Sequence, residues 1–222
     1  MARKPAKEQG DTLRIIIDSA FALFGKFGYD GVSVDQIAKK SDLSKGAMYW
    51  HFKNKDDLYV ACLKEVHDIF NRYVFSAIAG EANVSEALAS LTDGVDTMLH
   101  DRLVMRGIAG YWLEPSGRAD KRRIDATNKA FQDNAMTVLG SMFERGRSTG
   151  QLAFDENPED IARALMALIE NSVLTLRRGG AEESRHTSQI LMKAFFRAYG
   201  KGLAPANTEE FGSQQDSGRI AV

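Results

Sequence analysis

The sequence predicts an all-α fold, chiefly from the positions of its prolines and the spacing of its apolar residues. The 222 residues contain four prolines, which leave long intervals free of the strongest helix breaker: Pro5, Pro115, Pro158 and Pro205. Apolar side chains recur at helical spacing near the start of the chain, where one stripe is formed by Leu13, Ile16, Ile17, Ala20, Phe21 and Phe24. No run of strand-like alternation is long enough to compete with this pattern.

Capping residues and glycines set the boundaries of the individual helices. The signals are the capping box of Ser33 and Gln36, the Asn54 cap, the Asn157-Pro158 start, and the terminating glycines Gly25, Gly28, Gly179 and Gly180. We therefore expect helices over residues 13–24, 34–41, 45–50, 55–73, 84–100, 102–113, 118–147, 158–178 and 186–199.

The composition excludes several classes of protein. Hydrophobic residues make up 44% and charged residues 27%, which are ordinary values for a globular chain. The single Cys62 rules out an intrachain disulfide and suits a reducing compartment. No stretch approaches the roughly 18 to 20 apolar residues that span a bilayer, and no signal peptide is recognisable. We therefore expect a cytoplasmic protein with no membrane partner.

The net charge of -1, which taken alone argues against nucleic-acid binding, conceals an uneven distribution. Residues 1–55 hold ten Lys and Arg against six Asp and Glu, whereas residues 56–222 hold 19 against 24. A basic N-terminal part of +4 therefore precedes an acidic remainder of -5. Such a concentration of basic residues is typical of a nucleic-acid contact.

Two short helices joined by a tight turn form a candidate helix-turn-helix within the basic part, from Val34 to about Phe52. Ser44 is placed to cap the second helix. The side chains expected to pack against the first helix are Ile37, Ala38, Leu43 and Met48, and those expected to face outward are Lys45, Ala47, Tyr49 and His51.

The string SVDQIAKKSDLSKGAMYWHFKNKDDL, residues 33–58, resembles the TetR/AcrR family of bacterial transcriptional repressors. The close resemblance covers residues 11–60, and the remaining helices agree with the family in number and order only. Asp42 departs from the family pattern, which usually has Gly in the turn. Because Asp tolerates a left-handed backbone better than most residues, the motif survives.

The resemblance implies an N-terminal three-helix helix-turn-helix DNA-binding domain at 1–55, with 1–10 as a flexible basic arm, and a helical ligand-binding and dimerisation domain at 56–202. The polar composition of 203–222 predicts a disordered tail. The implied protein represses transcription by binding a palindromic double-stranded DNA operator as a homodimer. A small, largely apolar inducer would release it by pulling on the helix that begins at Lys55 and changing the separation of the two recognition helices.

The same resemblance implies which residues contact DNA. They are Ser33 and Ser44 at helix N-termini, Lys45, Gly46, Ala47 and Tyr49 in the major groove, and Trp50, His51 and Lys55 along the phosphate backbone. The alternative interpretation is that Tyr49 and Trp50 fill the core and that the lysines form a solvated face.

The helices beyond the motif would hold the ligand and the partner subunit. Candidate ligand contacts are His67, Met98, Met105, Tyr111, Trp112, Phe131 and Asn171, with Glu114 and Glu170 as further polar groups beside apolar segments. Candidate dimer contacts are Leu165, Leu168, Ser172, Ile190, Ala194 and Phe195. Each of these side chains could instead lie in the protomer core or in solvent, because periodicity alone does not separate these cases.

The sequence disfavours two other classes of protein. An enzyme is disfavoured because no nucleophile-elbow, zinc-protease, P-loop or paired-cysteine motif occurs. The four histidines, His51, His67, His100 and His186, are scattered without metal-ligand spacing, so we expect no metal and no cofactor. A dimeric ligand-binding module that has lost DNA binding is disfavoured by the intact Lys45, Tyr49, His51 and Lys55.

Overall fold

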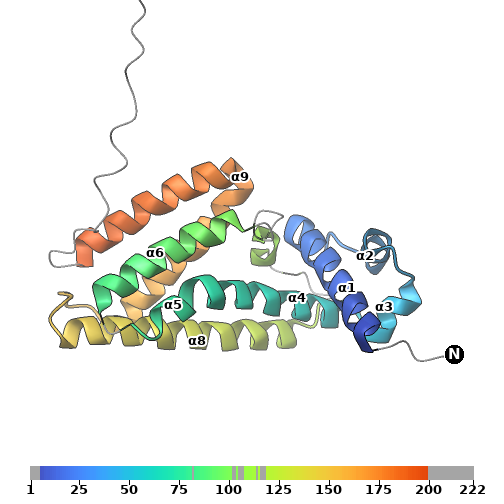
Figure 1. Ribbon diagram of the computed structural model, residues 1–222, viewed down its shortest axis with the longest axis horizontal. Helices are drawn as coiled ribbons and strands as arrows, with labels where there is room; N and C mark the ends of the chain where they lie inside the picture. The colour runs from blue at the N-terminus through green and yellow to red at the C-terminus, as the bar shows by residue number, and fades with distance from the viewer. Residues whose placement is uncertain are drawn as a thin grey trace, which may run out of the picture.

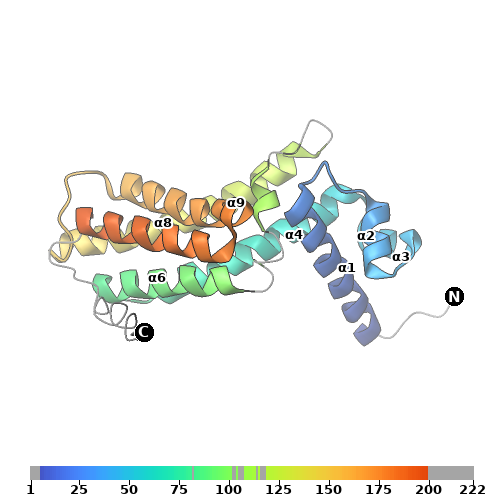
Figure 2. The ribbon, with the colours of Figure 1, turned by 90° about the horizontal axis from the view of Figure 1, so that it is seen from above.

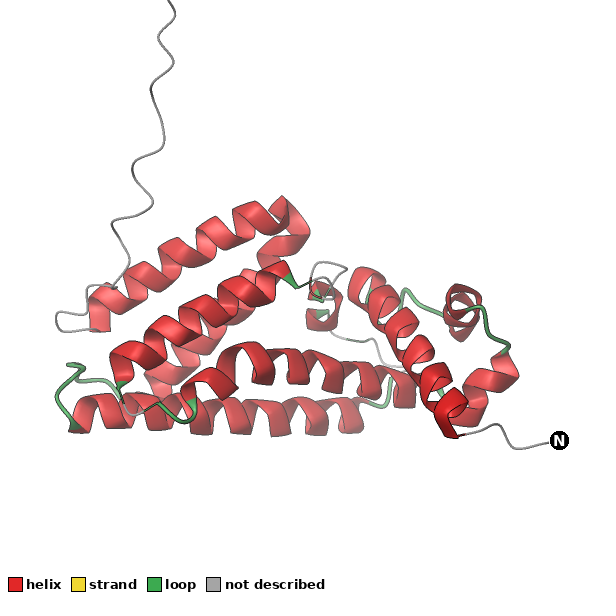
Figure 3. Cartoon of the chain, viewed as in Figure 1, coloured by secondary structure: helices red, strands yellow, loops and turns green. Residues whose placement is uncertain are grey.

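Every regular element of the protein is helical within the residues that the computed structural model describes, which are 6–81, 83–101, 104, 108–113, 115 and 119–199 (Figure 3). The α-helices are α1 (Ala6–Phe27), α2 (Val34–Ser41), α3 (Lys45–His51), α4 (Lys55–Phe70), α5 (Ser76–Ile78), α6 (Val84–His100), α8 (Lys121–Ser148) and α9 (Pro158–Tyr199). A π-helical segment, η1 (Asn71–Phe75), and a 3-10 helix, η2 (Ala109–Trp112), complete the set. The predicted all-α fold is confirmed.

The molecule is elongated, with α1, α2 and α3 gathered at one end and the remaining helices forming a longer body (Figure 1). Helix α4 begins beside α1 and runs into the body, where α8 lies along it. Seen from above, α6 and both arms of α9 lie toward the other end of the molecule from α2 and α3 (Figure 2). Helices α1 to α3 are therefore joined to the body mainly through the contacts of α1 with α4 and η2.

The long α9 consists of two helices separated by a sharp break. Gly180 has φ 80° and ψ -175°, a backbone conformation outside the helical region and open mainly to glycine. The chain folds back there, and the two arms of α9 form a hairpin (Figure 1). This break confirms the expected separation of the last two helices at Gly179-Gly180.

Several predicted boundaries shift. Helix α1 begins at Ala6, inside the expected arm at 1–10, and continues through Gly25 to Phe27, so Gly28 alone marks its end. Within the helix expected at 102–113, the described residues show only one helical residue, Val104, and the short 3-10 helix η2. Residues 1–5 and the expected tail at 203–222 lie outside the described residues. None of the described helices combines the length and apolar content needed to cross a bilayer.

An aromatic cluster joins the N-terminal helices to the body. The Tyr59 ring of α4 meets Phe24 edge-on at 5.0 Å and Tyr29 at 5.1 Å between ring centroids, and stacks on Tyr111 of η2 at 5.6 Å. Phe21 of α1 lies 5.3 Å from Tyr111. These five rings are buried, and such contacts stabilise beyond the area that they bury.

Candidate functional site

Helices α2 and α3 each begin at a short-range side-chain cap that the sequence encodes directly. Ser33 Oγ accepts from the Gln36 amide at 3.2 Å, and Gln36 Oε1 accepts from the Ser33 amide at 2.7 Å, which completes the predicted capping box. Ser44 Oγ accepts from the Ala47 amide at 3.1 Å. Both serines are exposed at helix N-termini, where backbone donors favour an anion.

The turn between α2 and α3 takes the conformation that Asp42 was expected to tolerate. Asp42 has φ 54° and ψ 38°, in the left-handed region, and the Leu43 amide donates to the Ala38 carbonyl at 3.0 Å. Ile37, Ala38 and Met48 are buried beneath the turn, as predicted. The turn therefore fixes the angle at which α3 leaves α2.

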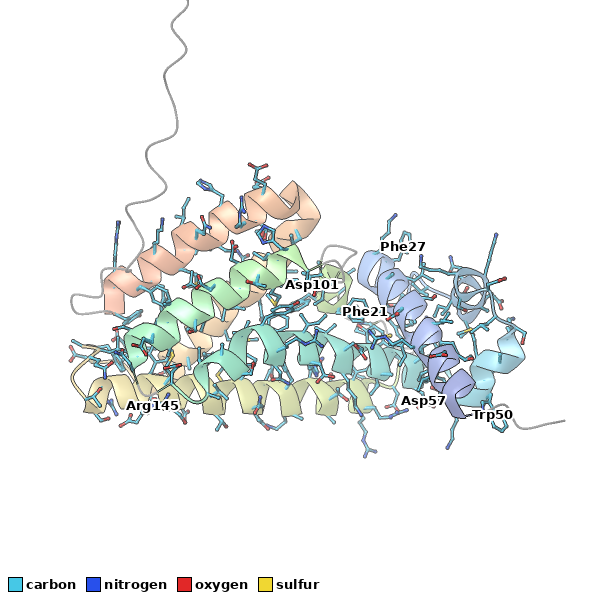
Figure 4. The ribbon with its side chains drawn as sticks, viewed as in Figure 1. Phe21, Phe27, Trp50, Asp57, Asp101 and Arg145 are labelled. Carbon is cyan, nitrogen blue, oxygen red and sulfur yellow. The ribbon has the colours of Figure 1, made fainter. Side chains whose placement is uncertain are left out.

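One face of α3 is open to solvent. The Tyr49 side chain is 51% exposed and the Trp50 side chain 74% exposed, so the interpretation that they fill the core is wrong. Trp50 lies at the edge of the molecule, at the opposite end of the N-terminal unit from Phe27 (Figure 4). A Cβ at Gly46 would meet only Ser44 Oγ, at 3.8 Å, so the backbone of α3 is open to close approach.

Lys45, the first residue of α3, is not isolated on this face. Its Nζ lies 2.5 Å from Asp35 Oδ1 of α2, and both side chains are exposed. An exposed pair of this kind contributes little to stability, about 0–1 kcal/mol. A phosphate group could therefore replace Asp35 as the partner of Lys45 at small cost.

Lys55, a predicted contact of the phosphate backbone, also makes contacts within the protein. Its Nζ donates to the Val32 carbonyl at 2.8 Å and lies 3.8 Å from the centroid of the Tyr29 ring. Burial lowers the pKa of this ammonium, and Asp30 and Asp56 partly restore it. Lys55 thus fixes the start of α4 against the α1–α2 connection, while His51 is half-buried at the end of α3.

A cavity of about 250 Å³ lies in the body, between α4, η2, α8 and α9. Four predicted ligand residues line it, namely His67, Tyr111, Trp112 and Phe131. The prediction missed much of the wall, which also includes Tyr59, Leu63, Val66, Leu113, Pro115, Lys121, Ile124, Asp125, Asn128 and Gln132. Their only sequence signal is helical periodicity, which does not distinguish a cavity wall from a filled core.

His67 is neutral in this wall near pH 7. Its ring stacks on Phe131 with centroids 4.3 Å apart and planes 6° from parallel. Burial lowers the pKa of His67 to about 4, although a hydrogen bond with Asn128 and the charge of Asp68 oppose the shift. The imidazole therefore offers one donor and one acceptor rather than a positive charge.

Glu170 brings a carboxyl group to the same cavity from α9. Burial raises the pKa of this carboxyl, and a hydrogen bond from the Trp112 indole partly offsets the rise. Its neighbour Asn171, the predicted contact, is exposed and does not line the cavity, because successive helix residues point about 100° apart. Of this pair of neighbours, Glu170 is the residue that reaches the cavity.

Other predicted ligand residues lie elsewhere. Met98 is fully buried in α6 and does not line the cavity, so its apolar character reflects core packing. Met105 and Glu114 lie outside the described residues.

The cavity wall contacts α1 directly through η2. Tyr111 Oη donates to the Phe21 carbonyl at 3.0 Å. A Cβ at Gly110 would lie 2.3 Å from the Phe24 carbonyl oxygen and 2.4 Å from that of Gly25, so only glycine allows this approach. A displacement of η2 by a ligand would therefore press on the backbone of α1.

A second connection joins the first turns of α8 and α4. Arg123 pairs with Asp57, and this pairing lowers the pKa of Asp57. Tyr29 Oη donates to Asp56 Oδ1 at 2.5 Å, and the Asp120 amide donates to the same oxygen at 3.3 Å. The start of α4 is thus attached both to the α1–α2 connection and to the helix that forms one cavity wall.

The predicted dimer contacts divide into buried and exposed groups. Leu165, Ser172 and Phe195 are buried within the protomer, so the prediction that they face a partner is wrong. Ser172 Oγ donates to the Leu168 carbonyl at 3.0 Å, and Leu168 itself is half-buried. Ile190, 54% exposed, and the exposed Ala194 remain available on the second arm of α9.

An N-terminal helix-turn-helix on an all-helical body defines a class of DNA-binding regulatory proteins. Within that class, the family model described as "Bacterial regulatory proteins, tetR family" matches residues 16–62. Residues 16–62 therefore carry the N-terminal sequence pattern of the tetR family.

Named relatives are transcriptional regulators of the helix-turn-helix type. The HTH-type transcriptional regulator AcrR of Shigella flexneri is 44% identical over 59 residues, which are 27% of each chain. The HTH-type transcriptional regulator SrpR of Pseudomonas putida is 28% identical over 136 residues, 60% of this chain and 62% of that protein. The matched segments thus span less than two thirds of these two relatives.

Solved structures share the fold over most of their length. A SmeT–triclosan complex has a TM-score of 0.72 at 21% identity, covering 87% of this chain and 94% of the other. NalD, described as the secondary repressor of the MexAB-OprM multidrug efflux pump in Pseudomonas aeruginosa, has a TM-score of 0.67 at 24% identity, covering 87% of this chain and 99% of the other.

Proposed function

We propose that the protein represses transcription by binding a palindromic operator as a homodimer, and that a small, largely apolar molecule in the body cavity releases it. The observation that carries the proposal is the open face of α3. Its Ser44 cap, Gly46 and the exposed Tyr49 leave the N-terminal part of a recognition helix free to enter a major groove. A domain division near Lys55 suits this assignment of functions.

Phosphate contacts would position α3 without selecting sequence. The exposed N-terminal caps at Ser33 and Ser44 supply backbone donors, and Trp50 and Lys45 lie on the same unit. Lys55 would act on DNA only indirectly, because its ammonium is engaged by Val32 and Tyr29. Ala47 and Tyr49 remain the candidate base contacts, since a methyl group or ring edge can meet a thymine methyl.

Release would depend on the two contacts between the cavity wall and the N-terminal helices. A ligand that moves η2 changes the Tyr111–Phe21 and Gly110–α1 contacts, and one that moves α8 changes the Arg123–Asp57 pair. Either movement would shift α1 and α4, and α1 contacts α2, which in turn contacts α3. The ligand acts as an inducer only if it binds the DNA-incompetent conformation more tightly.

The exposed Ile190 and Ala194 on the second arm of α9 support a partner contact there. Two such arms from each subunit could form an intermolecular bundle. Two-fold symmetry would then present two α3 helices to half-sites roughly 34–36 Å apart, or a multiple of that distance.

Footprinting on DNA upstream of the protein's own and adjacent genes tests the proposal, at fixed salt and with the full chain. We expect a protected palindrome, with affinity that falls steeply as salt rises because phosphate contacts release counterions. Absence of retention on any of these fragments at low salt would contradict DNA binding. A true cavity ligand that leaves operator affinity unchanged would contradict the proposed release.

A further inference from the structure

One acidic group in the body cavity has no counter-ion among the described residues. The Glu170 carboxyl forms no ion pair there, and the hydrogen-bond partner identified for it is the neutral Trp112 indole. Removing a carboxylate from water is costly unless a positive charge or several donors replace the lost hydration. Glu170 is half-buried, so it loses part of its hydration, and a single indole donor replaces little of what is lost. The site therefore favours a ligand that brings a positive charge.

The other ionisable groups of the cavity wall do not supply that charge. His67 is neutral near pH 7, because burial lowers its pKa to about 4. Lys121 and Asp125 also line the cavity, both exposed on the first two turns of α8, and their charges oppose one another. The described wall therefore holds two carboxyl groups against one ammonium group.

The remaining wall offers aromatic rings and a limited volume. Trp112, Phe131 and Tyr111 line the cavity, and aromatic faces attract cations by about 0.5–2 kcal/mol, most strongly when water is excluded. The volume of about 250 Å³ exceeds the roughly 150 Å³ that is sufficient for benzene. One or two rings carrying a short charged side chain would fit.

We propose that the cavity binds a small aromatic monocation, with its ammonium group paired to the Glu170 carboxylate and its ring packed among Trp112, Phe131 and Tyr111. The inference rests on the proposed function in taking this cavity as the effector site. The inference narrows the chemical class of the inducer from a largely apolar molecule to an amphiphilic amine. A wholly neutral ligand would bury the Glu170 carboxyl without replacing its hydration.

Three probes of one shape and different charge test this inference: phenethylammonium, phenethyl alcohol and phenylpropionate. The chain has two tryptophans, so Trp50→Phe leaves Trp112 as a fluorescence reporter inside the cavity. Titrated without DNA in this background, the ammonium probe should bind at least about tenfold more tightly than the alcohol, the equivalent of about 1.4 kcal/mol. Phenylpropionate should bind most weakly. Equal affinity for ammonium and alcohol, or tightest binding of the carboxylate, would overturn the proposal.

Glu170→Gln provides the second arm, with Glu182→Gln as the matched control on an exposed part of α9. Glu170→Gln should abolish the preference for the ammonium probe and change the alcohol affinity less than about twofold, whereas Glu182→Gln should retain the preference. A preference that survives Glu170→Gln would refute the pairing. If Glu170→Gln does not fold, the affinities of the three probes for the Trp50→Phe protein still test the proposal. A cation that binds here without altering operator affinity would support this inference and contradict the proposed release.

Discussion

Helix α3 and the cavity wall differ in how the chain builds them. The exposed face of α3 comes from one seven-residue helix, and each cap that orients it joins residues three apart. The cavity wall comes from four helical segments, and its key contacts join residues far apart in sequence, such as Tyr111 to Phe21. We infer that α3 depends mainly on local signals, whereas the wall depends on the packing of the whole body.

The largest expected effect is at Gly110, where the wall touches α1. Gly110→Ala would place a methyl group within 2.4 Å of two carbonyl oxygens, and the backbone would have to move. We expect the free energy of unfolding to fall by about 1–3 kcal/mol in denaturant titration. The matched control is Gly140→Ala on α8, where a Cβ meets nothing within 4 Å, so a gain of about 0.5–1 kcal/mol is expected. Equal stability of the two variants would contradict the close approach.

Tyr49→Ala should affect DNA binding and leave folding unchanged. Because the ring is 51% exposed, we expect the free energy of unfolding to change by less than about 0.5 kcal/mol, while operator affinity falls about tenfold or more. Phe27→Ala is the control, since that ring is 49% exposed at the other end of the N-terminal unit (Figure 4). A similar loss of operator affinity in both variants would contradict a specific contact between Tyr49 and DNA.

His67 should make the stability of the body depend on pH. Its pKa is about 4 in the folded protein and 6.5 in the unfolded chain, so the unfolded chain binds more protons between these values. The contribution of the neutral His67 side chain to the free energy of unfolding is complete above about pH 6.5 and is lost as the pH falls towards 4. After discounting for solvent screening, we expect the wild type to lose about 1–2 kcal/mol relative to His67→Phe over this window.

Glu170 titrates with the opposite sign, because burial raises its pKa. The difference between wild type and His67→Phe isolates the histidine, because Glu170 is present in both. Parallel stability profiles for the two proteins from pH 7 to pH 4 would show that His67 is not buried as described.

Gly46→Ala in α3 should raise the stability of the protein and lower its affinity for DNA. The new methyl group would meet only Ser44 Oγ, at 3.8 Å, and alanine is favoured over glycine inside a helix by about 0.5–1 kcal/mol. Unfolding should therefore require slightly more denaturant, while the methyl group keeps α3 from its closest approach to DNA. Unchanged operator affinity would place Gly46 away from the groove.

The smallest expected effect concerns the Asp35–Lys45 pair. Asp35→Asn frees Lys45 and removes a negative charge near the phosphates, so we expect affinity for any DNA sequence to rise by a few-fold. Lys45→Met should reduce the slope of log affinity against log salt by about 0.9 if Lys45 contacts one phosphate. A slope that Lys45→Met leaves unchanged would show that Asp35 keeps Lys45 from the DNA.

The sequence predicted most of α2 and α3 because their determinants are local. The Ser33 capping box, the Ser44 cap and the left-handed Asp42 are each recognisable within a few residues. The contacts that Lys55 makes within the protein were not predictable, since its partners Val32 and Tyr29 lie more than twenty residues away.

The cavity was only partly predictable for the same reason. Met98 and Trp112 are equally apolar in sequence, and only tertiary packing puts one in the core and the other in the wall. Which of Glu170 and Asn171 faces the cavity depends on the rotation of the helix about its axis. Two adjacent polar residues at the edge of an apolar stripe do not determine that rotation. Burial of Ser172 likewise follows the fold-back of α9 at Gly180, which brings Ser184 of the second arm to the Ser172 carbonyl.

The aromatic cluster that includes Tyr59 and Tyr111 has a thermodynamic consequence. Both tyrosines line the cavity and both pack against rings from the N-terminal helices, so part of one hydrophobic core belongs to both halves of the chain. Separate melting of α1 to α3 would expose that core, which favours one cooperative transition whose calorimetric and van't Hoff enthalpies agree. Heating should therefore abolish DNA binding and cavity binding at the same temperature.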